Sequence, residues 1–142
     1  MSQWSDYFHE NMQYPDVILQ AYLLCQESIL ASTAEQEALS AEAIAGAWKA
    51  EVPKPPIVIG ESKFIYVMEM FNEQDGLSFC LYQKVKKEGE EESSDAPNLL
   101  FVVKMDSLLW MGRFSNKHRE AVISYVKEIA STIFDYLVQE NE

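Results

Sequence analysis

The chain has 142 residues, 48% of them hydrophobic and 12% aromatic, which predicts one globular domain with an ordinary packed core. Its formal net charge of -12 disfavours direct binding to nucleic acid, because nucleic-acid-binding proteins neutralise phosphates with lysine and arginine. The sequence has no basic start followed by an apolar segment, and no apolar run near the roughly 20 residues that cross a bilayer. We therefore expect a cytoplasmic protein that does not bind membranes.

The negative charge is concentrated in the first third of the chain. Residues 1–52 contain eight acidic residues and a single basic residue, Lys49, which gives a net charge of -7, whereas residues 99–142 carry only -1. Two interpretations stay open at this point. The acidity either forms a face for a basic partner or only keeps the protein soluble and monomeric.

Residues 1–52 are predicted to form two helices. The first spans Asp16 to Ala31, where apolar side chains recur at helical spacing. The second is expected to run from Ser32 to about Ala50, because Ser32 with Glu35 and Thr33 with Gln36 form overlapping capping boxes before an alanine-rich segment. Prolines in the corner at residues 53–56 then end helical structure, since proline lacks an amide hydrogen.

Residues 57–114 are predicted to form an antiparallel sheet of three to five strands. Residues 57–59 and 63–71 have strand character, and Asp75-Gly76 supplies a hairpin turn before residues 77–86. The apolar run at residues 99–103 predicts a central strand that is covered on both sides, and residues 107–114 extend the sheet. The acidic segment 87–97 is expected to be a loop outside the core.

The last element is predicted to be a helix over residues 116–139, capped by Ser115 or Asn116, with apolar side chains at helical spacing. Such a helix is about 36 Å long, so it can cover the sheet and still offer part of its apolar face to a second copy of the chain. The expected fold is α+β, in a single domain of residues 1–142. Its parts are two N-terminal helices, the antiparallel sheet and the long C-terminal helix packed on the sheet.

We find no pattern typical of catalysis, metal binding or cofactor binding. His9 and His118 lack the spacing of metal ligands, and Cys25 and Cys80 each lie in an apolar segment, as expected for buried thiols. Five glycines in the whole chain form neither a phosphate-binding loop nor a dinucleotide fingerprint. We therefore expect no enzymatic activity, no metal and no cofactor.

Two groups of residues are candidates for a binding site. Acidic side chains of the second helix and tryptophans near apolar residues are expected to contact a partner protein: Glu35, Glu37, Glu42, Trp48, Trp110 and Met111. A cluster of positive residues at the start of the last helix is expected to bind an anion or to form internal salt bridges: Arg113, Lys117, His118 and Arg119.

The predicted function is an acidic protein-binding module, with an inhibitor or immunity-type protein that masks a partner's basic surface as the leading interpretation. In size, acidity, sheet and terminal helix the chain is also similar to type III secretion chaperones, although no motif carries that resemblance. A third alternative is a small-molecule enzyme with a pocket between sheet and helices. Its polar groups would be Tyr66, Tyr82, His118 and Arg119.

Overall fold

The computed structural model describes residues 7–8, 10, 18–26, 28–32, 41–48, 55–59, 62–74, 77–85, 98–105 and 108–140. Its described strands form one antiparallel sheet in the order β2-β1-β7-β6-β5-β4-β3. In chain order these strands are β1 Ile18–Cys25, β2 Ser28–Ser32, β3 Ile57–Ile59, β4 Ser62–Gln74, β5 Leu77–Lys84, β6 Leu99–Met105 and β7 Leu108–Phe114.

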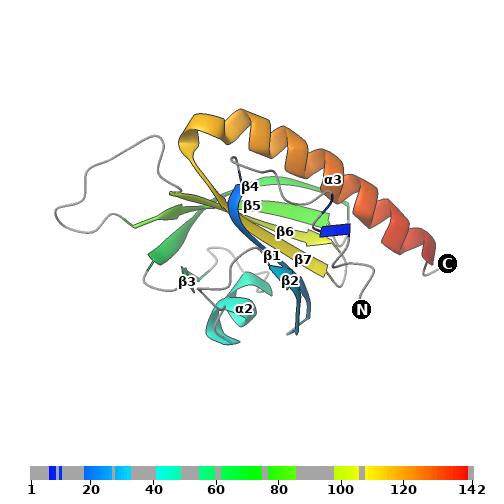
Figure 1. The fold of residues 1–142 in the computed structure, drawn as a ribbon, viewed down its shortest axis with the longest axis horizontal. Helices are drawn as coiled ribbons and strands as arrows, with labels where there is room; N and C mark the ends of the chain where they lie inside the picture. The colour runs from blue at the N-terminus through cyan, green and yellow to red at the C-terminus, as the bar shows by residue number, and fades with distance from the viewer. Residues whose placement is uncertain are drawn as a thin grey trace.

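Two described helices lie on opposite sides of this sheet. The short helix α2 spans Ala41–Trp48, and the long helix α3 spans Arg119–Glu140 after a 3-10 turn, η2, at Asn116–His118. Figure 1 shows α3 running along one side of the curled sheet and α2 on the other side. We call these two sides of the sheet the α3 side and the α2 side.

The predicted first helix is wrong, because its residues form strands β1 and β2. In β1, residues of one parity face the α3 side, such as Ala21 and Leu23, and residues of the other parity face the α2 side, such as Tyr22 and Leu24. All four side chains are buried. A strand covered on both faces is apolar throughout and lacks the polar alternation that marks a strand, so its apolar residues also match a helical stripe.

The predicted second helix and the predicted strand number also need correction. Ser32 ends strand β2 rather than capping a helix, and the described helix is limited to Ala41–Trp48. The sheet has seven strands rather than three to five, since β1 and β2 join it beside β7. The acidic segment 87–97 lies outside the described residues.

The strands predicted in residues 57–114 are all present as β3 to β7. Residues 99–103 do form a central strand that is buried on both sides. The C-terminal helix is also confirmed, although it begins at Arg119 after the 3-10 turn. Ser115 stands at the start of that turn, where its carbonyl oxygen accepts a hydrogen bond from the His118 amide at 3.1 Å, and its side chain makes no capping hydrogen bond.

Each side of the sheet has its own apolar core. On the α3 side, Val122, Val126 and Ala130 of the helix pack against inward-facing residues of β1, β5, β6 and β7. On the α2 side, Ile44 and Ala47 of the helix pack with Ile57 and Ile59 of β3. They also pack with those side chains of the central strands that face away from α3. The central strands are therefore sealed from solvent on both faces.

The α3-side core closes tightly over Gly112 in β7. The ring of Phe101 in β6 lies over this glycine and makes an edge-on contact with Trp110, with ring centroids 5.0 Å apart. A Cβ atom added at Gly112 would come within 2.4 Å of the Phe101 ring and 3.0 Å of the Ile18 side chain. Because Phe101 is completely buried, its ring has little room to move aside.

We expect Gly112→Ala to destabilise the protein by about 1–3 kcal/mol, the usual effect of forcing atoms into a packed core. Urea unfolding monitored by circular dichroism would measure the change in the free energy of unfolding.

Gly46 in α2 supplies a matched control, because a Cβ atom there would make an ordinary contact of 3.6 Å with Pro55. Gly46→Ala should leave stability unchanged or raise it by up to about 1 kcal/mol through helix propensity. Equal effects of the two alanine substitutions would contradict the close packing of Phe101 on Gly112.

Candidate interaction surface

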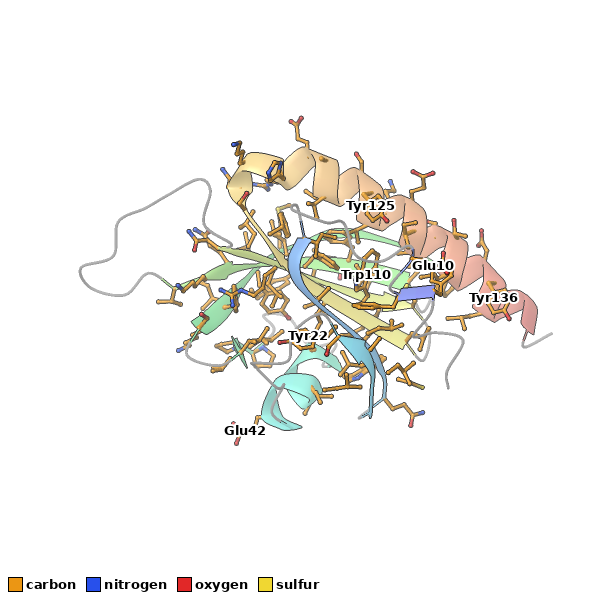
Figure 2. The ribbon with its side chains drawn as sticks, viewed as in Figure 1. Glu10, Tyr22, Glu42, Trp110, Tyr125 and Tyr136 are labelled. Carbon is orange, nitrogen blue, oxygen red and sulfur yellow. The ribbon has the colours of Figure 1, made fainter. Side chains whose placement is uncertain are left out.

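Trp110 and Met111 are both fully buried. Trp110 faces the α3 side and Met111 faces the α2 side, because neighbouring residues of a strand point to opposite faces. Figure 2 shows Trp110 between the sheet and α3. The prediction that these two residues contact a partner is wrong for this fold, since β7 is a central strand that is covered on both sides.

Trp48 has a role inside the fold. Its indole Nε1 donates a hydrogen bond to the backbone oxygen of Gln26, at 2.9 Å, in the turn between β1 and β2. The backbone oxygen of Trp48 accepts a hydrogen bond of 2.7 Å from Nζ of Lys104 in β6. The C-terminal end of α2 is thus tied to two separate parts of the sheet, and the half-buried Trp48 ring joins the α2-side core.

Only one of the three predicted acidic contacts falls within the described residues. Glu42 is exposed in the first turn of α2, and in Figure 2 its side chain points away from the body of the protein. Glu35 and Glu37 lie outside the described residues. Glu42 remains a candidate contact for a basic partner.

The positive residues near the last helix are divided between two places. Arg113 is close to the end of β7, pairs with Leu100 and faces the α2 side, where its guanidinium carbon lies 5.1 Å from the centre of the Phe64 ring. Lys117, His118 and Arg119 belong to η2 and to the first turn of α3. The predicted cluster of four therefore does not converge, and the Arg113 contact is of the cation-π kind.

The polar residues of the enzyme alternative are also divided. Tyr66 and Tyr82 are cross-strand neighbours in the α2-side core, with ring centroids 5.8 Å apart in an edge-on arrangement. His118 and Arg119 begin the helix that covers the α3 side. The four side chains line no common space between the sheet and one helix, so the geometry gives this alternative no support.

Tyr82 is completely buried, and among the described residues its hydroxyl has no hydrogen-bond partner. Burial, with smaller effects of Cys80 and Tyr66, raises the pKa of Tyr82 above its ordinary value of 10.0. Burial also raises the pKa of Tyr66, with smaller contributions from Cys80 and Glu69, and a hydrogen bond from the Glu69 backbone to its hydroxyl partly opposes the increase.

Among the described residues, no three side chains of His, Cys, Asp or Glu gather closely enough to hold a metal ion. The same part of the chain contains no helix long and apolar enough to cross a membrane. Neither Cys25 nor Cys80 forms a disulfide bond.

Exposed apolar side chains gather at one end of the sheet. Seven large hydrophobic residues are exposed among the described ones, and five of them lie on β3, on β4 or directly after β5, each between 39% and 46% exposed. We call this group the β4 patch: Val58, Ile65, Val67, Met68 and Val85.

The β4 patch lies on the same face of the sheet as α3, on strands that this helix does not cover. Ile65 pairs with Gln83 and Met68 with Leu81, and Leu81 belongs to the α3-side core, so these residues share that face. Helix α3 contacts strands β5 and β6 of the sheet. The same face of β3 and β4 is therefore left exposed, with Val67 at an irregularity of the β4–β5 pairing.

The amino-acid sequence of β4 contains a signal for this exposed surface. Between Lys63 and Phe71 apolar residues occur on both faces of the strand, a pattern that predicts partial cover on both faces. The structure covers Phe64 and leaves Ile65 and Val67 exposed. Periodicity identifies the two faces of a strand, whereas the strand's position in the sheet decides which face is covered.

We expect Tyr82→Phe to leave stability near pH 7 unchanged or to raise it by about 1 kcal/mol, because it removes a buried hydroxyl without a partner. In the unfolded chain Tyr82 loses its proton above about pH 10, while the folded state retains it. The wild-type free energy of unfolding should therefore fall as pH rises above about 10, and Tyr82→Phe should reduce this fall.

Urea unfolding at pH 7 and at about pH 10.5 measures both effects. Tyr136→Phe is the comparison variant, because Tyr136 is exposed on α3 and its substitution should reduce the fall at high pH less than Tyr82→Phe does. A large loss of stability in Tyr82→Phe at pH 7 would show that the hydroxyl is satisfied.

No protein-family model matches the chain, and a search of curated proteins finds no relative. Solved structures do match. Profilin IB of Acanthamoeba castellanii aligns over 94% of this chain and 98% of its own length, with a TM-score of 0.62 and 12% sequence identity. Profilin IA of the same organism aligns over the same shares, with a TM-score of 0.61 and 12% identity.

At this identity the likeness concerns the fold alone. It covers nearly the whole of both chains, so it includes the sheet and the C-terminal helix together. The predicted arrangement of two N-terminal helices before a sheet of three to five strands is therefore wrong. The chain has a profilin-like fold, with a curled seven-stranded antiparallel sheet and a long C-terminal helix.

Proposed function

We propose that this protein works by binding another protein through the β4 patch. The observation that carries this proposal is the gathering of five exposed apolar side chains on one end of an otherwise well-covered sheet. Isolated exposed hydrophobic residues are ordinary on soluble proteins, whereas neighbouring ones mark interaction surfaces. Burying the patch against a partner would remove this apolar surface from water.

The surroundings of the patch suit a protein interface. Lys63 and Gln83 are exposed polar residues next to the apolar side chains, since Lys63 pairs with Val58 and Gln83 pairs with Ile65. Interfaces commonly have an apolar centre within a polar rim, which supplies hydrogen bonds and keeps the free surface soluble.

The charge of the protein supports a basic partner. A net charge of -12 attracts positive surfaces over several ångströms, and Glu42 and Glu69 are exposed. Complementary charge increases the rate at which two proteins meet. Because Cys25 and Cys80 form no disulfide bond, we propose that this binding takes place in a reducing compartment, the cytoplasm.

The proposal is limited to binding. The similarity to profilins offers no support for an inhibitor, an immunity protein or a secretion chaperone. Self-association through α3 stays a separate prediction, for which the exposed Tyr136 is the relevant side chain.

A photo-crosslinking amino acid placed at Val67 tests the surface. In extracts of the host cell we expect it to capture a defined partner, which mass spectrometry identifies. Capture should fail when Ile65→Lys is also present, because a lysine disrupts the apolar centre of the patch.

The matched control carries the crosslinker at Ile29, which is 42% exposed on β2, at the opposite edge of the sheet. The β4 patch has no binding role if crosslinkers at Val67 and at Ile29 capture the same proteins. The same conclusion follows if Ile65→Lys does not reduce capture at Val67.

The basic character of the partner has its own test. With the captured partner purified, the association rate should fall markedly between about 50 and 500 mM salt, since salt screens attraction between exposed charges. An association rate that does not depend on salt would remove the basic partner from the proposal and leave the patch itself in place.

A further inference from the structure

Strand β4 is much longer than its outer neighbour. It has 13 residues, whereas β3 has three and pairs only with Ser62, Lys63 and Phe64. From Ile65 to Gln74, no described strand lies along the outer side of β4. The β4 patch therefore lies beside a strand edge whose backbone is largely unpaired within the described part of the chain.

The direction of the backbone groups follows from one hydrogen bond. The amide of Val85 donates to the carbonyl oxygen of Lys63 at 2.8 Å, so the backbone of Lys63 faces β5. The backbone groups of successive residues point to opposite edges of a strand. Because those of Lys63 face β5, those of Phe64 and Tyr66 face outward. Phe64 pairs with Ile57 of β3, and no described strand pairs with Tyr66 on that side.

The two faces beside this edge differ in chemistry. Ile65 and Met68 present exposed apolar side chains on the α3 side. On the α2 side, Glu69 is exposed and shares its face with Cys80, its partner across the strand pair. An added strand would thus meet apolar groups on one face and a carboxylate on the other.

We propose that the outer edge of β4 accepts an extended segment of the partner protein as an additional strand, with apolar and basic side chains in alternation. The apolar side chains lie next to Ile65 and Met68, and the basic ones lie next to Glu69. This inference rests on the proposed function and specifies the form of its partner. Strand addition at a free sheet edge draws affinity from backbone hydrogen bonds and specificity from alternate side chains.

The edge also limits what can bind. The pairing of β4 with β5 has three register shifts, which bend the strand and shorten the regular stretch available to a partner. The Tyr66 hydroxyl accepts a hydrogen bond from the Glu69 backbone. An incoming strand that pairs with Glu69 must therefore displace this hydroxyl. A second copy of this chain is a poorer occupant, because two molecules of net charge -12 repel each other.

The probe is a peptide of seven residues that alternates valine and lysine, acetylated and amidated, added to the full-length protein. We expect it to bind and to protect the Tyr66 amide from hydrogen exchange, as measured by NMR. Ile65→Lys should abolish binding, and Ile29→Lys, at the opposite edge, should not.

Two N-methylated peptides separate strand addition from side-chain docking. One carries methyl groups on the valine amides and the other on the lysine amides, so each blocks one edge of the extended peptide and leaves every side chain in place. Loss of binding confined to one of the two supports strand addition. If both methylated peptides still bind, or if both lose binding, strand addition is wrong.

Charge reversal tests the basic positions. Glu69→Lys should weaken binding of the valine-lysine peptide by about two- to fivefold, the usual effect of one exposed ion pair, and should strengthen binding of a valine-glutamate peptide. No response to this reversal overturns the basic part of the inference.

The remaining outcomes are also decisive. If the valine-lysine peptide does not bind while the crosslinker at Val67 still captures a partner, strand addition by a basic segment is wrong and the proposed function stands. If light scattering shows a dimer that Ile65→Lys dissociates, the occupant is a second copy, and the inferred partner is wrong.

Discussion

The pairing of β1 with β7 is the interaction that determines the arrangement of the whole sheet. It joins Ile18–Cys25 to Leu108–Phe114 in an antiparallel register, although these segments lie far apart in the chain. The pairing places β7 inside the sheet rather than at its edge, so Trp110 is buried on one face and Met111 on the other. Both edges of the sheet are consequently formed by other strands, β2 and β3, with β4 extending beyond the short β3.

The width of the sheet explains why an apolar surface is left over. Seven strands spaced about 4.8 Å apart span roughly 29 Å, whereas a helix with its side chains is about 10–12 Å wide. Curling of the sheet brings some strands closer to α3, but one helix still cannot cover the whole face. The exposed end of that face is the β4 patch, and beside it lies the edge of β4 that pairs with no other described strand beyond Phe64. Geometry therefore places apolar side chains beside backbone groups that no described strand pairs.

Charge and apolar surface contribute differently to the proposed binding. The net charge of -12 acts at a distance and favours encounter with basic partners, while the β4 patch supplies the short-range contact. The profilin-like fold does not choose between partners, because one fold serves many functions. In the proposed binding, side chains outside the core, such as Ile65 and Glu69, would select the partner.

Local sequence was sufficient to predict the strands from Ile57 to Phe114 and the C-terminal helix, and it gives the strong acidity directly. These features follow from periodicity and from composition. The strand at Ile18–Cys25, the burial of Trp110 and the exposure of Val67 became evident only in the folded chain. Burial depends on which strand or helix lies alongside a residue, and that neighbour comes from a distant part of the chain, so no local pattern contains it.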